Sequence, residues 1–471
     1  MICESKKHHT IKYKTINQAE QNPTSVWWHE TLNIIIDLLK NSKISKESIA
    51  GVGCSGMFPV ILPVNKKGTP LREGILYNID TRSKDQIEFL QKKIENNYPS
   101  EAVKNNLNYQ SVLPKIKWIK DNESDIWAQT QTILDARGYI VFKLTGEKVI
   151  DHYTAFHGGF GYSYSKNDWC SKAFEISGVD IKVMPQIKWP YEIAGYINSE
   201  AAKLTGLLKG TPVVTGTGDA LSEMLSSGIY KTNESVLLYG STMPIMTIVE
   251  KTSSLNEKGY PIAPSWTKNK NIISSGVRSG MSSFSWLSNL VGYKTVEELF
   301  LKTENLDKTK SSEDGLFAFP YFTSQIEPKS TLQTSASFIG LSNNHKLQHL
   351  LKSLIEGLGF SLRLSIEDTP GISTIKAVGG GAKSPHLLQT ISDICNIEQQ
   401  TIKYNVGAPL GAAWLAGYGL GILKEDSLED WVKKDIAYFP QEEKVITYNK
   451  LYKKFKEVVN HPNKLHNWSF I

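Results

Sequence analysis

Several features that would place a chain in a special class are scarce or missing from these 471 residues. The four cysteines lie far apart, with no CxxC pair and no histidine at ligand spacing, which excludes a zinc motif and a disulfide framework. The longest apolar stretches, such as residues 34–36, are far too short to span a membrane, and the first residues contain no apolar signal region. We therefore expect a cytoplasmic protein that is neither exported nor embedded in a membrane.

The charged residues also show no bias toward one kind of partner. Lys and Arg number 53 against 47 Asp and Glu, which gives a net charge of +6, and acidic residues are interleaved with basic ones along the chain. Such mixing favours solubility and argues against a nucleic-acid surface. The composition, with 40% hydrophobic residues, is typical of a globular protein. The length suits about three domains, or two larger ones.

The first clear element is an amphipathic helix that starts at Asn22 and Pro23. Asn22 is a good N-cap residue, and proline is favoured at the first helical position. Apolar residues then recur at helical spacing, at Trp28, Leu32, Ile35, Ile36 and Leu39. Short strands are predicted at residues 49–53 and 60–64, followed by a helix-rich stretch over residues 84–148.

The second half of the chain alternates between short β-rich runs, glycine turns and helices. This alternation predicts an α/β architecture. The β-rich runs are residues 212–215, the hairpin formed by residues 236–239 and 245–249, and residues 375–378. The turn after the first of these runs leads into a helix at residues 220–226. The turn after the last one ends at Ser384 and leads into a helix that begins at Pro385. Long buried helices are predicted from Leu347 and over residues 410–420, with a further aromatic helix near the end.

Two of the glycine turns have the shape of a phosphate site. A turn between a strand and a helix exposes backbone N–H groups, and the helix N-terminus adds partial positive charge. The turn from Gly379 to Ser384 lacks the P-loop spacing, and the turn from Gly216 to Asp219 does not continue as a dinucleotide fingerprint. A tight turn without a ligand is the alternative for each of them.

Asp219 is the carboxylate of greatest interest. It stands directly after a glycine turn, in the first turn of a predicted helix, where the helix dipole favours its ionised form. A carboxylate in a fixed position is what phosphoryl transfer to a hydroxyl needs as general base. The alternative is that Asp219 only caps its helix.

Asp80 and Arg82 form a second candidate pair. A carboxylate accepts and a guanidinium donates several hydrogen bonds in fixed geometry, so the two side chains suit the hydroxyls of a polyol. The alternative is a surface ion pair. His152 and His157 have no partner at metal-ligand spacing, so we interpret them as ordinary surface or core histidines.

Taken in order, these motifs resemble the FGGY family of carbohydrate kinases from Glu20 to Phe455. The match consists of several short motifs in register rather than one. The matching segments are Glu20-Gln21-Asn22-Pro23 with Trp27-Trp28, Pro70-Leu71 with Asp80-Thr81-Arg82, Leu144-Thr145-Gly146-Glu147 with Asp151, Gly218-Asp219, Gly240-Ser241-Thr242, residues 336–356, and Gly379 to Ser384.

The resemblance implies an α/β protein of two actin-like ATPase (ribonuclease H-like) domains with an interdomain cleft. Residues 1–228 would be the sugar-binding N-terminal domain, and residues 229–471 the nucleotide-binding C-terminal domain with a helical tail. Asp219 would be the catalytic base, ATP and Mg2+ the cofactors, and no metal ligand is assigned. Substrate-binding candidates are Met57, Phe58, Asp80, Arg82 and Asp219. Nucleotide-binding candidates are Gly240, Ser241, Thr242, Gly280, Gly379, Gly380, Gly381 and Ser384.

The sequence departs from the family pattern in three places. Family members open with a hairpin that carries DxGT and binds the phosphates, and here no glycine occurs in the first fifty residues. We therefore expect a first domain that is incomplete at its start, with an exposed sheet edge that predicts poor solubility or partnering. Separately, a homodimer is among the assemblies we expect. Met57-Phe58-Pro59 stands where xylulokinases show QMH, and residues 323–325 replace the usual GER.

The sequence thus predicts a cytoplasmic kinase that phosphorylates a sugar, sugar acid or polyol with ATP, most like the xylulokinase and gluconate kinase branch. One alternative is a catalytically impaired or truncated homologue that acts only in binding or regulation. A more distant one is an actin-like protein that uses ATP to hold a conformation. Which sugar is phosphorylated does not follow from the sequence.

Overall fold

A computed structural model describes residues 2–97, 107–251, 262–303, 306–322, 335–369, 371–403 and 406–460. The chain forms two compact units. Unit 1 contains residues Met1–Ser226 with two later segments, Ala263–Asn271 and Val406–Leu428. Unit 2 contains Ser227–Ile262, Ile272–Asn405 and Glu429–Ile471. The sequence-based boundary between residues 228 and 229 stays a prediction.

Unit 1 begins with a small antiparallel sheet that the sequence analysis did not anticipate. Strands β1 (Lys12–Thr15) and β2 (Gln18–Gln21) form a hairpin, and β2 also pairs with β5 (Gly74–Ile75). All four residues of β1 are exposed. The hairpin carries no DxGT motif, so the expectation of an incomplete first domain stays a prediction.

The predicted first helix is confirmed, in two parts. A π-helical turn, η1 (Pro23–Trp28), leads into α1 (His29–Ser42). The Asn22 side chain accepts hydrogen bonds from the backbone N–H groups of Thr24 and Ser25, as an N-cap residue should. Trp27 and Trp28 are buried in the core of unit 1, whereas the apolar residues of α1 are half-buried or, at Ile36, exposed.

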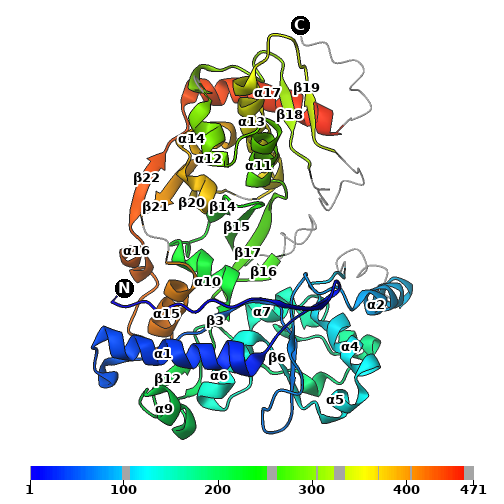
Figure 1. Cartoon of the computed structure of the whole chain (residues 1–471), viewed down its shortest axis with the longest axis vertical. Helices are drawn as coiled ribbons and strands as arrows, with labels where there is room; N and C mark the ends of the chain where they lie inside the picture. Colours follow the sequence, from blue (N-terminus) through cyan, green and yellow to red (C-terminus); the bar gives the residue numbers. More distant parts are fainter. Residues whose placement is uncertain are drawn as a thin grey trace. The chain divides into compact units, whose positions relative to one another are not determined.

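The rest of unit 1 alternates between short strands and helices (Figure 1). Its helices are α2 (Lys84–Asn97), α4 (Val112–Asn122), α5 (Ser124–Gln129), α6 (Ala136–Thr145), α7 (His152–His157), α8 (Ser171–Ser177), α9 (Ser199–Thr205), α10 (Asp219–Ser226) and α15 (Ala408–Gly419), with 3-10 turns at Lys46–Ser48 and Ile181–Val183. Its further strands are β3 (Ser55–Gly56), β4 (Leu62–Val64), β6 (Thr132–Leu134), β7 (Val149–Asp151), β8 (Tyr162–Ser163), β9 (Asp168–Trp169), β10 (Gln186–Lys188), β11 (Ile193–Tyr196), β12 (Pro212–Val214) and β13 (Thr217–Gly218).

Strand β13 and helix α10 carry Asp219. Strand β13 pairs in parallel with β3, and Val52 forms an isolated parallel bridge with Val213. The strand predicted at residues 49–53 is therefore wrong in its bounds, because the β structure within that range is a bridge at Val52 and the strand lies at Ser55–Gly56. Helix α15 packs against α10 so closely that a Cβ on Gly411 would overlap the backbone of Ser222. The Ala and Gly content of α15 allows this approach.

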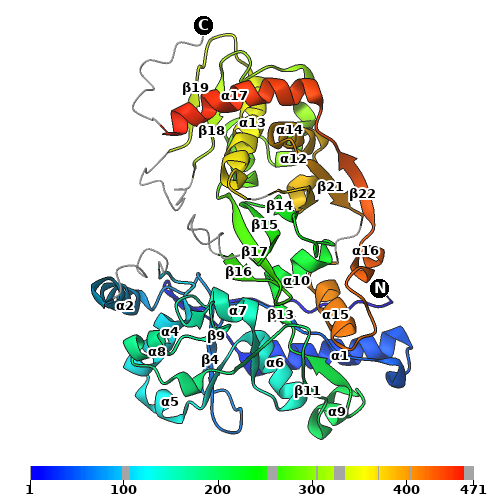
Figure 2. The ribbon, with the colours of Figure 1, turned by 180° about the vertical axis from the view of Figure 1, so that it is seen from behind.

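Unit 2 contains most of one seven-stranded sheet, in the order β16, β17, β15, β14, β20, β21, β22 (Figure 1 and Figure 2). The strands are β14 (Glu234–Leu238), β15 (Met243–Glu250), β16 (Ile262–Pro264), β17 (Lys270–Val277), β20 (Thr374–Val378), β21 (Glu398–Ile402) and β22 (Lys434–Tyr438), and a separate hairpin is formed by β18 (Phe317–Phe319) and β19 (Ser337–Ile339). Strands β14 and β15 form the predicted hairpin, and β14, β20 and β21 run parallel.

Helices cover this sheet and bury its apolar residues. They are α11 (Met281–Leu290), α12 (Val296–Lys302), α13 (Leu347–Ile366), α14 (Pro385–Cys395), α16 (Ser427–Trp431) and α17 (Glu442–Asn460), with a 3-10 turn at Leu306–Lys308. Side chains of α13 and α14, such as Leu354, Leu358 and Leu388, pack with Leu237 and Ile375 of the sheet in one core. The α/β class predicted from the sequence is therefore confirmed.

Within the described ranges, none of the helices combines the length and apolar character needed to cross a lipid bilayer.

Candidate active site

Asp219 is half-buried at the start of α10, directly after the parallel pair of β3 and β13. Its Oδ1 accepts a 2.8 Å hydrogen bond from the N–H of Ala220, the next residue, whereas an N-cap side chain accepts from the N–H two or three residues after itself. Burial, with a smaller contribution from the nearby Glu223 carboxylate, raises the pKa of the Asp219 carboxyl to about 6. A carboxylate with such a pKa is suited to accept a proton near neutral pH.

A fully buried ion cluster holds the strand that leads to Asp219. Arg137 is flanked by Asp135 and Asp151, at 3.4 Å and 3.6 Å from its Nη2. Arg137 also donates to the carbonyl oxygen of Thr215, and Asp151 accepts a 2.7 Å hydrogen bond from the hydroxyl of Thr217. Both ends of the segment before Asp219 are therefore fixed by the same cluster.

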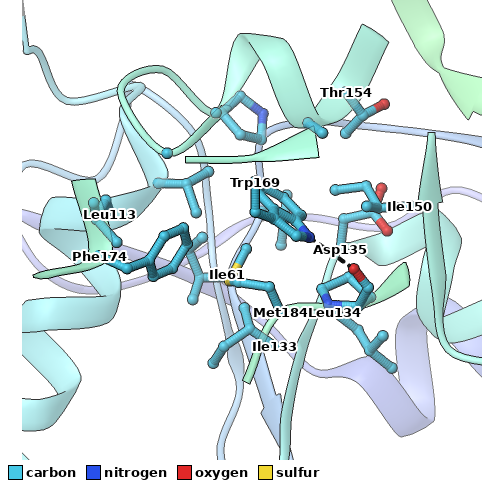
Figure 3. A pocket seen from close by; sticks show the side chains of 17 residues that line it. Ile61, Leu113, Ile133, Leu134, Asp135, Ile150, Thr154, Trp169, Phe174 and Met184 are labelled. Carbon is cyan, nitrogen blue, oxygen red and sulfur yellow. Dashed lines mark hydrogen bonds between the residues drawn. The ribbon is translucent and has the colours of Figure 1, made fainter. Parts of the chain in front are cut away.

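The ion cluster leaves some polar atoms without hydrogen-bond partners. In the described part of the chain, Asp135 Oδ2, Asp151 Oδ1, Arg137 Nε and the Thr154 hydroxyl are buried and form no hydrogen bond. Asp135 and Thr154 also line an otherwise apolar cavity (Figure 3), in which Trp169 donates to the carbonyl oxygen of Pro185. The cavity, about 30 Å³, has room for about two water molecules. It is too small for a sugar.

Met57 and Phe58 belong to different environments. Met57 packs at the margin of the main core of unit 1. The ring of Phe58 lies against β13, so close that a Cβ on Gly218 would overlap the ring. The same ring makes edge contacts with Tyr153 and His157, at centroid distances of 5.5 and 5.6 Å. The fold therefore brings Phe58 close to the residue that precedes Asp219. Met57 directly follows Gly56, which pairs with Gly218 in the parallel register of β3 and β13.

Asp80 and Arg82 are buried, not at the surface as in the alternative interpretation. Asp80 accepts from the N–H of Ala19 and from Arg82, and Arg82 also binds Glu20. Arg72 binds the same Glu20, and the two guanidinium groups lie over the ring of Trp118. These contacts tie β2 to the segment after β5. They favour a structural role for the pair, and its role in substrate binding stays a prediction.

The predicted nucleotide-binding residues of unit 2 come together at one end of its sheet. The turn Gly240, Ser241 and Thr242 follows β14, and Gly280 opens α11 after β17. The N–H of Gly280 donates to the Ser241 carbonyl, and the N–H of Met281 to the Gly240 carbonyl, both at 2.8 Å. A Cβ on Gly280 would lie 2.7 Å from the Gly240 carbonyl oxygen, so only glycine fits there.

The third loop, Gly379 to Ser384, joins the same end from β20. The N–H of Gly381 donates to the carbonyl of Tyr239 at 3.0 Å, which holds this loop against the end of β14. Gly379 has φ +96°, a conformation that favours glycine, whereas a Cβ on Gly380 would point into open space. Ser384 caps α14 through its hydroxyl, as predicted. The loops present backbone groups and small residues on an open rim, which suits a phosphate-bearing ligand.

The described residues contain no group of three or more His, Cys, Asp or Glu side chains that could hold a metal ion. This composition fits Mg2+ only if the ion is bound largely by phosphates and water, which is a common arrangement for Mg2+. Residues 323–325, the third departure from the family pattern, lie outside the described residues.

Sequence analysis did not single out Arg137, Tyr153, Thr217 or His157 as functional. His157 has no partner at metal-ligand spacing, Arg137 and Tyr153 belong to no motif, and Thr217 stands in the turn from Gly216 to Asp219 without a role of its own. Their grouping depends on contacts between residues far apart in the chain, as between Asp151 and Thr217. Sequence spacing alone could not have revealed it.

Comparisons with known proteins agree with this arrangement. The N-terminal domain of the FGGY family of carbohydrate kinases matches residues 1–226, and the C-terminal domain of the same family matches residues 261–420. Xylulose kinase from Bacillus subtilis is 25% identical over 472 residues, covering 98% of this chain and 93% of the relative. Gluconokinase from the same organism is 23% identical, covering 93% and 86%.

Solved structures show the same fold. Xylulose kinase from Rhodospirillum rubrum superposes with a TM-score of 0.86 at 23% identity, covering 97% of this chain and 93% of that one. Gluconate kinase from Lactobacillus acidophilus gives a TM-score of 0.82 at 22% identity, covering 98% and 92%. The expected actin-like two-domain α/β fold is thereby confirmed.

Proposed function

The chain belongs to the FGGY family of carbohydrate kinases, a family of phosphotransferases that use ATP, and on this premise we propose that it phosphorylates a hydroxyl of a sugar, sugar acid or polyol with Asp219 as general base. The observation that carries the proposal is Asp219 itself. It is a half-buried carboxylate with a pKa raised to about 6, at the end of a strand fixed by a buried ion cluster.

The proposed reaction is a direct transfer. The substrate oxygen attacks the γ-phosphorus of ATP, an O–P bond forms, and the bond from that phosphorus to the bridging oxygen breaks, so that ADP leaves. The proton of the attacking hydroxyl passes to Asp219. Ionised Asp219 is the form that can take it.

In this proposal the loops of unit 2 bind the nucleotide. Backbone N–H groups and small side chains at Gly240, Ser241, Thr242, Gly280, Gly379, Gly380, Gly381 and Ser384 would surround its phosphates and adenosine. Mg2+ on the phosphates would supply charge neutralisation. The convergence of the three loops, held by the bonds from Gly280 to Ser241 and from Gly381 to Tyr239, supports this assignment.

The test is a substrate panel with the full-length chain, ATP and Mg2+, read by ADP formation. We expect at least one ketose, alditol or aldonate to stimulate ADP release, with a stoichiometric amount of sugar phosphate. A chain that binds ATP but forms no sugar phosphate with any member would contradict the proposal. That result would favour the alternative, a homologue that acts only in binding, which the comparisons do not support.

Two further expectations accompany the proposal: a cytoplasmic location and a homodimer. Size-exclusion chromatography with light scattering tests the second directly, because a dimer doubles the 52.7 kDa chain mass. A mass that stays at that of one chain over a wide concentration range would exclude the dimer.

A further inference from the structure

Three rings beside Asp219 form a group that the proposed chemistry does not yet use. Phe58, Tyr153 and His157, called here the ring cluster, contact one another in pairs. The closest pair is Tyr153 and His157, with ring centroids 4.4 Å apart. Phe156 lies on the other side of His157, at 5.4 Å. The His157 ring is therefore surrounded by aromatic side chains.

The ring cluster lies next to Asp219. The ring of Phe58 occupies the space that a Cβ on Gly218 would need, and Gly218 directly precedes Asp219. The negative charges of Asp151 and Asp219 both raise the pKa of the Tyr153 hydroxyl, in addition to its burial. These two observations place the ring cluster in the neighbourhood of Asp219.

His157 carries an unused polar atom. Its Nε2 is buried and has no hydrogen-bond partner among the described residues. Burial lowers the pKa of the His157 imidazole to about 4, so the ring is neutral at pH 7. A neutral imidazole donates from one nitrogen and accepts at the other, and a sugar hydroxyl can do both. An unpaired buried polar atom is costly, so a hydroxyl placed there would gain a hydrogen bond that the protein alone leaves unmade.

The charges around the ring cluster disfavour an anionic ligand. Asp219 and Asp151 act on Tyr153. The cation paired with Asp151 is Arg137, which is fully buried and also bound by Asp135 and the Thr215 carbonyl. A substrate carboxylate placed against these rings would therefore meet the like charges of Asp219 and Asp151, while the guanidinium group of Arg137 is already engaged.

We propose that His157 hydrogen-bonds a substrate hydroxyl and that the ring cluster makes this kinase selective for a neutral sugar or polyol over a sugar acid. The inference rests on the proposed kinase function and narrows its substrate class. The apolar ring faces would pack against the C–H groups of the sugar, and His157 would orient the carbon chain of the sugar so that one hydroxyl faces Asp219. His157 is thus a binding residue, with no part in the proton transfer.

The first experiment tests charge selectivity by binding, independent of turnover. Isothermal titration with the full-length chain would compare alditols and aldonates that share a carbon skeleton, xylitol with xylonate and glucitol with gluconate, alongside the neutral ketoses. We expect at least one neutral compound to bind about tenfold more tightly than its acid counterpart. Equal or tighter binding of the acids, or no binding of any neutral member, would overturn the inference.

The second experiment tests His157. H157F keeps an aromatic ring among aromatic neighbours and removes both nitrogens, whereas H157Q keeps an amide that can donate and accept. We expect H157F to weaken binding of the neutral sugar about tenfold, the loss of one hydrogen bond, with the KM for ATP unchanged. H157Q should recover part of that loss.

The controls separate this inference from the proposed function. Unchanged sugar affinity in H157F, with a melting temperature equal to that of the wild type, would remove His157 from the site. If H157F is unstable, H157L, which also removes both nitrogens, is compared with the wild type instead, and unchanged sugar affinity in it leads to the same conclusion. Failure of the proposed function looks different, because neutral sugars would then bind without any sugar phosphate being formed.

Discussion

Replacing Asp219 by Asn separates the catalytic and the structural consequences of one buried carboxylate. Burial raises its pKa from 3.8 to about 6, a shift of about 2 units, which corresponds to about 3 kcal/mol between its two protonation states. If ionised Asp219 is the base, kcat/KM of the wild type should be level above pH 6 and fall about tenfold for each pH unit well below it. D219N should lose about 10²- to 10⁴-fold in kcat at pH 7.5.

The same shift predicts the stability of the variant. The folded carboxyl binds its proton more tightly than the unfolded one, so the wild type loses stability as pH rises from about 4 to about 6. D219N has no such group. It should therefore be more stable than the wild type at pH 7.5, by up to about 3 kcal/mol, and this gain should vanish near pH 4.

Urea unfolding at pH 4, 5, 6 and 7.5, together with steady-state kinetics over the same range, measures both effects. D219E is the matched control, since it keeps a carboxylate but moves it by one methylene. The reasoning is refuted if D219N turns over at a rate near the wild type, or if it is less stable than the wild type at pH 7.5. Turnover that is independent of pH between 5 and 7 would also contradict the assigned pKa.

Three further predictions test the surroundings of the site. G379A should lower the melting temperature, because residue 379 has φ +96° and its Cβ would lie 2.8 Å from the Tyr239 carbonyl oxygen. G380A should fold normally and raise the KM for ATP, because its Cβ would enter open space. Equal melting temperatures of the two variants would contradict this loop geometry. T217V should cost about 1–3 kcal/mol in urea unfolding because Asp151 loses a buried donor, and T217S should restore it. D80N should lower the free energy of unfolding by about 3–5 kcal/mol, because it breaks the buried pair with Arg82, and should leave the KM for sugar unchanged. A raised KM for sugar at wild-type stability would instead assign Asp80 to substrate binding.

Elements with local signals were predictable from the sequence. The helix after Asn22 was found because its cap, its proline and its apolar spacing are all encoded within about twenty residues. The loop ending at Ser384 was found for the same reason. The hairpin of β1 and β2 was missed, because β1 is fully exposed and its turn contains no glycine, so neither periodicity nor turn chemistry marked it.

The environment of the candidate site was less predictable, because it depends on long-range contacts. The spacing of Asp80 and Arg82 indicated that they could meet, but their burial depends on Glu20, about sixty residues earlier. The position of Asp219 was recognised from its motif, whereas its raised pKa follows from burial. A local pattern can identify such a carboxylate but cannot give the dielectric environment that tunes it.

The most direct test of the central claim is the transfer of label from [γ-32P]ATP to a neutral sugar by the full-length chain, compared with D219N under the same conditions. We predict labelled sugar phosphate with the wild type and a loss of at least about 100-fold with D219N. Equal transfer by both proteins would contradict the role of Asp219. Label released only as inorganic phosphate, whatever sugar is added, would contradict the assignment as a sugar kinase.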